Sequence, residues 1–539
     1  MYIIFAAITS FTKQLIVFLG NKMTFKVESY KRGIAISTLY NVINKGLVFL
    51  GSIIVAYYFG TQIKTDIYFY AYNTIIIFSA FITSLNASVL IPESMRLRIQ
   101  QGELPAMQFL NYFFYLYILL TVIICAILFL NPVKAFIIIS DFPEQSLQNE
   151  SAILLLATPL ILLIPTVNLL TDILTSHKFF SIPMVAGIIN GIFSILFLFL
   201  FHNVLGIFSL LTGLIISYVI NFIILVILMK KKLHWQFRLK RLQIDKRIWK
   251  NIAFAQAGNI TTSLSSYAPL YFLSGFSMGI ITSLNFAQQL SSIPTTLITN
   301  QFSSVSGIKF NELYAKKGFS EINRVFLSTT SILLFILTPI SSIFFLYSSS
   351  ITSFLLERGA FEISGVVYTS LFLQYMGLLL PMLAINTFVA RLFMAGQKIM
   401  QSFTYQVAFN IVLIFFIWVG IQKTGITGYP LALIALHILN VLFCYILLKK
   451  FFPEVNYGKV LMVFLKIIFL NFSILVLVLL SKDLLSSIPG IANIILGSML
   501  YIMILLIVNW KIKLSPEINL LLKQLFAYTP LRRLNRKEP

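Results

Sequence analysis

Residues 109–131 read Phe109-Leu-Asn-Tyr-Phe-Phe-Tyr-Leu-Tyr-Ile-Leu-Leu-Thr-Val-Ile-Ile-Cys-Ala-Ile-Leu-Phe-Leu-Asn131. This run has no charged side chain, and a helix of about 20 apolar residues crosses the ~30 Å hydrocarbon core of a bilayer. About fourteen such runs follow one another along the 539-residue chain, separated by short polar stretches. The sequence therefore predicts an all-α integral membrane protein.

The composition supports this fold class. Hydrophobic residues make up 58% of the chain and charged residues 11%, against about 25% charged residues in soluble domains. The net charge of +23 does not indicate nucleic-acid binding, because the basic residues lie between apolar runs, where anionic lipid head groups are the expected partners. Cys125 and Cys444 lie inside apolar runs and form neither a metal-binding spacing nor a disulfide framework. We expect no cofactor and no metal.

The apolar runs give the predicted membrane spans, whose ends are uncertain by about 2–4 residues. They are 34–59, 67–91, 109–131, 152–174, 182–202, 206–229, 251–275, 280–305, 326–347, 366–389, 402–421, 425–448, 460–481 and 489–509.

The charges of the loops alternate from one side to the other. The positive-inside rule places the more basic loops in the cytoplasm, so we expect both termini there. The loops on the other side carry only Lys64, Lys134, Arg358, Lys423 and Lys482. The basic loops and the tail carry Lys26, Lys31, Arg32, Arg96, Arg98, the run from Lys230 to Lys250, Lys309, Lys316, Lys317, Arg324, Lys449, Lys450, Arg532, Arg533, Arg536 and Lys537.

An internal repeat indicates two halves. Gly206–Lys231 and Gly425–Lys450 align without gaps and share a first glycine, an asparagine (Asn221 and Asn440) and a final lysine pair. Repeats of one orientation predict two pseudo-symmetric six-helix bundles with a pathway between them. The predicted organisation begins with an N-terminal cytoplasmic or interfacial segment at 1–33, of which residues 1–22 take no part in the mechanism. Two lobes follow at 34–229 and 251–448, joined by a basic linker at 230–250, and two further spans lie within 449–509. A basic tail at 510–539 contains a predicted interfacial helix at Pro516–Leu531.

No catalytic motif is present, and the four histidines are scattered. Ionisable residues inside spans usually face a bundle interior or a water-filled cavity. Lys45, which shares its span with Asn41 and Asn44, is the leading candidate for a cavity, and Asp172 is a candidate ion or proton site. Lys466 lies near the end of its span, where long side chains reach the interface.

Several motifs resemble the lipid II flippases of the mouse virulence factor (MurJ/MviN-like) family, within the multidrug/oligosaccharidyl-lipid/polysaccharide exporter superfamily. The resemblance covers about residues 34–450. The motifs are Ile53-Ile-Val-Ala-Tyr-Tyr-Phe-Gly60 followed by Thr65-Asp66, Phe180-Ser-Ile-Pro183 with Asn190, Arg358-Gly359-Ala360-Phe361, Leu380-Pro381 and Ala390-Arg391-Leu-Phe393.

The resemblance implies a bacterial cytoplasmic-membrane protein that moves an undecaprenyl-linked sugar pyrophosphate through a central cationic cavity by alternating access. Alignment on the Phe-Gly and Asp66 motif places the first cavity arginine of the family at Lys45 and keeps Asp66. Three other arginines of the family fall at Gly51, at Phe78 or Ser79, and at Gln289. The substrate candidates are therefore Lys45, Asp66, Gln289, Asn41 and Asn44.

Three functions remain open at this point. The first is a flippase for lipid II or a related lipid-linked glycan, which works with other proteins of cell-envelope assembly. The second is a cation-coupled exporter of drugs or metabolites on the same scaffold. The third is an integral-membrane polysaccharide polymerase or glycosyltransferase, which the absence of a large extracytoplasmic loop disfavours. We expect transport without catalysis.

Overall fold

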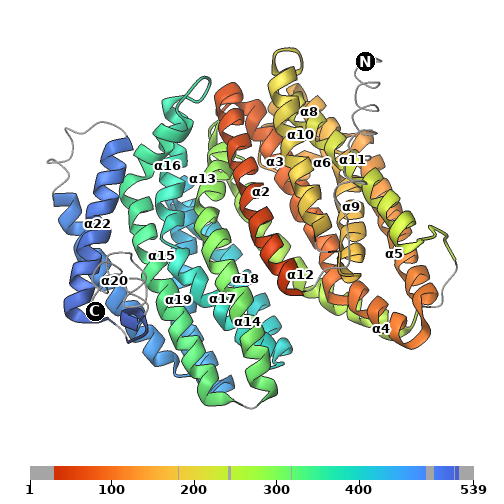
Figure 1. The fold of residues 1–539 in the computed structure, drawn as a ribbon. Helices are drawn as coiled ribbons and strands as arrows, with labels where there is room; N and C mark the ends of the chain where they lie inside the picture. The colour runs from red at the N-terminus through yellow and green to blue at the C-terminus, as the bar shows by residue number, and fades with distance from the viewer. Residues whose placement is uncertain are drawn as a thin grey trace, which may run out of the picture. The chain divides into compact units, whose positions relative to one another are not determined.

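A computed structural model describes residues 30–179, 181–240, 244–316, 318–480, 491–514 and 516–520, and in these residues every regular element is helical. The chain divides into two compact units, 1–282 and 283–539. The first unit contains α2 (Tyr30–Phe59), α3 (Ile63–Leu85), the π-helix η1 (Asn86–Leu90), α4 (Ile91–Gln101), α5 (Glu103–Leu130), α6 (Pro132–Ile139), α7 (Glu144–Asn149), α8 (Ser151–Ala157), α9 (Pro159–Ser176), α10 (Ser181–Leu205), α11 (Phe208–Leu233) and α12 (Lys246–Leu273) (Figure 1).

The division falls within α13 (Ile280–Pro294). The predicted lobe boundary at residues 230–250 stays a prediction. The second unit continues with the π-helix η2 (Thr295–Thr299), α14 (Asn300–Ala315), α15 (Phe319–Leu356), α16 (Ile363–Gly377), α17 (Leu380–Ala395), α18 (Ile399–Thr424), the 3₁₀ turn η3 (Gly425–Thr427), α19 (Gly428–Phe451), α20 (Tyr457–Leu480) and α22 (Ile491–Ile512).

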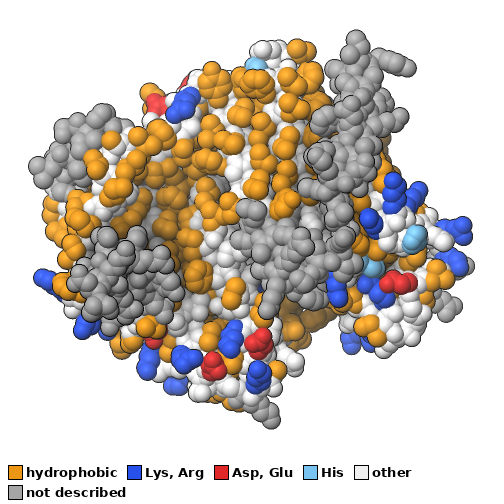
Figure 2. Space-filling view, in the orientation of Figure 1, with side chains coloured by type: hydrophobic (Ala, Val, Ile, Leu, Met, Phe, Trp, Pro, Cys, Tyr) orange, Lys and Arg blue, Asp and Glu red, His pale blue; other side chains and the backbone are white. Residues whose placement is uncertain are grey.

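The helices confirm the predicted all-α membrane fold. Ten helical stretches of the described residues are long and apolar enough to cross a bilayer, or eleven if α16 and α17, which meet at a 47° bend, form one span. One of the ten, Ile399–Phe451, contains both α18 and α19. The predicted spans at 251–275 and 280–305 are helical but are not among the ten, because they are rich in Asn, Gln, Ser and Thr. Figure 2 shows hydrophobic side chains over much of the visible face.

The first unit is built around α3, α5, α9 and α11. Large aromatic and aliphatic side chains such as Phe113, Tyr117 and Leu170 fill its core. α12 packs along α3 through polar contacts: Asn259 Nδ2 donates to Ser84 Oγ at 2.7 Å, and Gln256 Nε2 donates to the Phe81 carbonyl at 3.1 Å. These contacts satisfy polar groups that a bilayer could not.

The second unit is built around the 38-residue helix α15, which packs against α16, α17 and α20. Its core includes Phe326, Phe388 and Phe452. The added pair α20 and α22 is joined by a hydrogen bond from the Tyr501 hydroxyl to Asn471 Oδ1 at 2.8 Å. This bond satisfies the polar groups of two apolar helices.

The two repeat segments share local geometry. Gly206 and Gly425 both have a left-handed backbone, with φ of +54° and +63°, a conformation that favours glycine. Asn221 donates from Nδ2 to Asn190 on the preceding helix at 2.6 Å, and Asn440 accepts from the Tyr405 hydroxyl on its own preceding helix. The shared turn and the shared interhelix contact support the proposed duplication.

The start and the end of the basic linker are bound to the first unit. The Trp235 indole donates to Asn111 Oδ1 at 2.8 Å, and Asn111 Nδ2 donates to the Gln236 carbonyl at 2.6 Å. At the other end, Arg247 pairs with Glu93 at 3.2 Å. The linker is therefore anchored near both ends.

Part of the predicted interfacial helix lies outside the described residues. Residues 516–520 are helical, and Ile518 is buried. The segment 1–29 and residues 521–539 also lie outside them.

Candidate functional site

Asp66 is a buried carboxylate whose two oxygens both accept hydrogen bonds. It lies in the first turn of α3 and is only 2% exposed. Its Oδ2 accepts from the Gly279 amide at 2.6 Å, and its Oδ1 accepts from the amide and the hydroxyl of Thr282 at 2.8 and 2.6 Å. Hydrogen bonds to an ionised carboxylate are short and strong. Asp66 therefore holds the α12–α13 turn against the start of α3.

Glycine is required at the turn that Asp66 holds. Gly279 has φ +92°, and a Cβ atom there would lie 2.9 Å from Thr61 Cβ and 3.0 Å from the Thr61 carbonyl oxygen. Both the backbone conformation and the close approach exclude a side chain.

Two further contacts hold the same end of α12. The Tyr70 and Tyr267 hydroxyls both donate to the Ile139 carbonyl. The Ser274 hydroxyl accepts from the Asp141 amide at 2.8 Å. We call Asp66, Gly279, Thr282 and these partners the α12 latch.

The other cavity candidates of the first unit lie on α2. Lys45 is partly exposed and has no ion pair with any described residue. Asn44 packs against Gly187 of α10, where an added Cβ would lie 3.0 Å from its Nδ2. The side chain of Asn41 lies outside the described residues. The cavity roles of these residues stay predictions.

Asp172 belongs to a polar network inside the first unit. Its Oδ2 accepts from Asn86 Nδ2 at 2.8 Å, and Asn86 Oδ1 accepts from the Tyr117 hydroxyl at 2.9 Å. Asn86 is fully buried and begins η1, and π-helical turns are frequent at functional sites. The structure thus brings Asp172 to Asn86, not to Lys45.

The Arg-Gly-Ala-Phe motif forms the turn between α15 and α16. Gly359 has φ +61°, and the Arg358 guanidinium donates to the Phe354 carbonyl at 3.0 Å. Phe361 is buried edge-to-face against Phe286, with ring centroids 5.7 Å apart. Ala360 lies between them, partly buried. The motif shapes and anchors a turn.

The remaining candidates lie in the second unit on different helices. Gln289 on α13 donates to Asn285 Oδ1 at 2.6 Å. Arg391 on α17 donates from Nε to Ser303 Oγ on α14 at 2.9 Å. Lys466 on α20 is exposed, and its place at the interface stays a prediction. Among the described residues, His, Cys, Asp and Glu form no group that could hold a metal ion.

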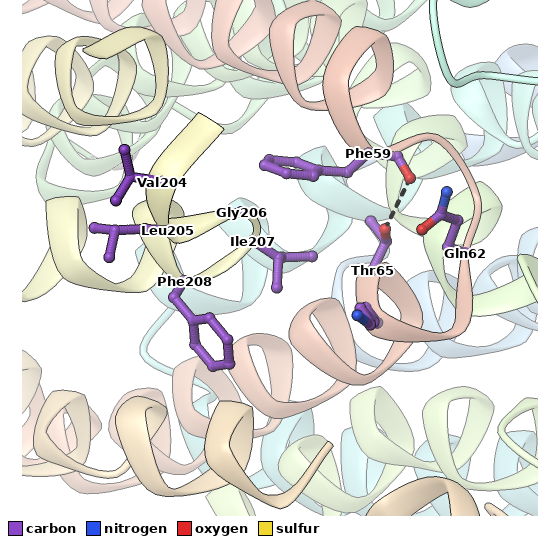
Figure 3. A pocket seen from close by; sticks show the side chains of 9 residues that line it. Phe59, Gln62, Thr65, Val204, Leu205, Gly206, Ile207 and Phe208 are labelled. Carbon is purple, nitrogen blue, oxygen red and sulfur yellow. Dashed lines mark hydrogen bonds between the residues drawn. The ribbon is translucent and has the colours of Figure 1, made fainter. Parts of the chain in front are cut away.

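A pocket of about 460 Å³ opens between the α2–α3 turn and the α10–α11 turn (Figure 3). Its apolar lining includes Phe59, Val204 and Phe208, and Lys64 is its cation. The Thr65 hydroxyl donates to the Phe59 carbonyl and closes one edge. None of the predicted cavity residues lines this pocket.

A cluster of ionisable side chains lies at the C-terminal end of α9. His177 Nε2 lies 3.6 Å from Glu103, and Arg98 contacts the same carboxylate at 3.3 Å. Burial is the main reason that the pKa of His177 is lowered from 6.5, and the neighbouring Arg98 lowers it further. The folded protein thus favours the neutral ring.

The His177→Gln variant tests this cluster. A pKa lowered by folding means that His177 stabilises the fold above pH 6.5 and that this contribution is lost as the pH falls below it. We expect the melting temperature of the parent to fall between pH 7 and 5 by about 1–2 °C more than that of the variant. Equal pH profiles in a detergent melting series would contradict the assignment.

Several of these positions carried no sequence signal. Tyr70, Tyr267, Gly279 and Thr282 are ordinary residues of apolar segments until the fold brings them together. Asn86 gave no signal either, because a π-helix has no recognisable local sequence. Ser303 became relevant only through its contact with Arg391.

Long apolar helices joined by buried polar contacts, in two compact units, define a multi-pass membrane protein. The family model for the lipid II flippase MurJ matches residues 55–503. The chain belongs to this family of transporters. A probable lipid II flippase MurJ of Borreliella burgdorferi (strain ATCC 35210 / DSM 4680 / CIP 102532 / B31) is 25% identical over 405 residues, which cover 74% of this chain and 79% of that protein.

Solved structures show the same fold. The structure described as lipid II flippase MurJ in an inward closed conformation has a TM-score of 0.72 at 19% identity, and covers 89% of this chain and 99% of its own. An inward-facing multidrug resistance MATE family transporter of the MOP superfamily has a TM-score of 0.61 at 13% identity, over 77% of this chain and 98% of its own. The predicted family is confirmed, and the likeness to the MATE transporter shows a shared fold.

Proposed function

We propose that this chain moves lipid II, or a related undecaprenyl-pyrophosphate-linked oligosaccharide, across the bacterial cytoplasmic membrane by alternating access. The observation that carries the proposal is the family match over residues 55–503. A pyrophosphate and its sugars cannot cross hydrocarbon unaided. Fixed cations inside the protein replace their hydration while the lipid tail stays in the bilayer.

The proposed topology has both termini in the cytoplasm and the basic loops against anionic lipids. Transport without bond-making chemistry is part of the proposal, and the family match supports it. Partners among cell-envelope assembly proteins belong to the same proposal. Asp172, partly exposed and bonded to Asn86, is proposed as the proton-accepting group if transport is coupled to protons.

The function is tested by complementation of a strain depleted of its lipid II flippase, with lipid II assayed on each leaflet. Rescue with lipid II on the outer leaflet is the expected result. Failure despite membrane expression, with another lipid-linked glycan accumulating outside in a vesicle assay, would reassign the substrate.

The Lys45→Ala variant tests the cation proposed to take part in transport. We expect translocation to fall about tenfold, the equivalent of about 1.4 kcal/mol of lost substrate interaction. Lys466→Ala is the matched control, because Lys466 is an exposed cation of another span, and it should transport like the parent. A translocation rate of Lys45→Ala equal to that of the parent would show that Lys45 does not belong to the site.

A further inference from the structure

Arg391 is a cation held inside the second unit. It lies on α17 (Leu380–Ala395), one of the two bent helices that are together apolar enough to span. The side chain is only partly exposed. A charged group at such a position is costly unless it has a partner.

The protein fixes the guanidinium from one side. Nε donates to Ser303 Oγ at 2.9 Å, and the stem lies on Gly307, where an added Cβ would be 3.3 Å from Arg391 Cδ. Ser303 and Gly307 are four residues apart and so share one face of α14. The glycine makes room for the stem, and the serine orients the head group.

No carboxylate of the described residues forms an ion pair with Arg391. The bond to Ser303 uses Nε and leaves the terminal pair, Nη1 and Nη2. The buried hydroxyl of Thr299, one turn before Ser303, also has no hydrogen-bond partner in the structure. The α14–α17 contact thus holds a fixed positive charge without a protein anion.

The nearby lysine has a different arrangement. Lys398 donates to the Phe451 carbonyl, and its Nζ lies 4.6 Å from the centre of the Phe452 ring. It is committed to joining the start of α18 to the end of α19. Unlike Lys398, Arg391 therefore has donors, Nη1 and Nη2, for which no bond to the protein is described.

We propose that Arg391, positioned by Ser303 and Gly307, is an anion-binding subsite for the diphosphate group of a lipid-linked substrate. The planar pair Nη1 and Nη2 matches two phosphate oxygens, a fit that lysine cannot reproduce. The assignment rests on the proposed function for the identity of the lipid. Arg391 lies at none of the positions where the family has a cavity arginine that this sequence lacks. It would therefore be an additional cation.

Binding to the purified full chain tests the subsite directly. The probes are undecaprenyl diphosphate, undecaprenyl monophosphate and phosphatidylglycerol, each titrated into protein in nanodiscs of zwitterionic lipid. We expect the parent to bind the diphosphate at least about tenfold more tightly than the other two. Arg391→Gln should lose this preference, Arg391→Lys should keep only part of it, and Lys466→Ala should keep it all. Melting curves check that each variant is folded.

The outcomes separate the subsite from the function. Equal diphosphate affinity in Arg391→Gln and the parent, no diphosphate binding by the parent, or equal affinity for phosphatidylglycerol each overturns the subsite. Diphosphate binding that depends on Arg391, without lipid II translocation by the parent, keeps the subsite and overturns the function. Translocation of lipid II by the parent, with diphosphate binding unaffected in Arg391→Gln, keeps the function and overturns the subsite.

Discussion

The Asp66→Asn variant should lose roughly 3 kcal/mol of local stability at the α12 latch. Both carboxylate oxygens accept hydrogen bonds, from Gly279 and from Thr282. An amide has one acceptor oxygen, so its NH₂ group must face a donor in either orientation. We expect faster amide hydrogen exchange in residues 274–282 and a severalfold change in translocation rate.

Glu144→Gln is the control for this experiment. Glu144 is an exposed carboxylate of the same unit, and its only described bond is from Gln148 at 2.9 Å. It should leave both exchange and transport unchanged. Unaltered exchange at residues 274–282 in Asp66→Asn would show that the carboxylate does not hold the turn.

The Gly428→Ala variant should destabilise the second unit by about 3 kcal/mol. A Cβ atom on Gly428 would overlap the carbonyl group of Gly420, and one on Gly420 would lie 2.6 Å from the Gly428 carbonyl oxygen. These are backbone atoms, which cannot turn aside as a side chain can. The contact of α18 with α19 must open to admit even one methyl group.

Gly46→Ala is a control with the same chemical change. Nothing lies within 4 Å of a Cβ atom at Gly46, which is exposed on α2. Alanine in an open helical position adds about 0.5–1 kcal/mol of stability. We expect the melting temperature of Gly428→Ala to lie well below that of the parent. The melting temperature of Gly46→Ala should equal that of the parent or lie slightly above it. Equal melting of the two variants would refute the close packing.

The apolar runs predicted most of the fold. Each predicted span falls on helices wherever its residues are described, because the thickness of the bilayer sets the length of an apolar run. The sequence did not predict the π-helices at Asn86–Leu90 and Thr295–Thr299 or the break between α16 and α17 as separate helices. These depend on which neighbours satisfy the freed backbone groups, and that is a property of the packed protein.

The site was less predictable than the fold. Asp66 was identified through a family motif, but its donors at Gly279 and Thr282 are more than two hundred residues away. The Arg-Gly-Ala-Phe motif indicated the family but not the role of its residues. In the structure, Gly359 and Phe361 shape a turn. Arg391 was named as part of a family motif, and its fixation depends on the contact between α14 and α17. Long-range pairing of this kind leaves no periodicity in one sequence.

The polarity of α12 has a consequence for biosynthesis. A segment with Asn251, Gln256 and Asn259 among its serines and threonines gains little by leaving the translocon for lipid on its own. Its polar groups find partners on α3, at Phe81 and Ser84, and α3 is made long before α12 emerges from the ribosome. Entry of α12 into the membrane should therefore be assisted by the helices already inserted. Truncated nascent chains that lack α3 should leave α12 uninserted, so that the order of synthesis, as well as hydrophobicity, builds this protein.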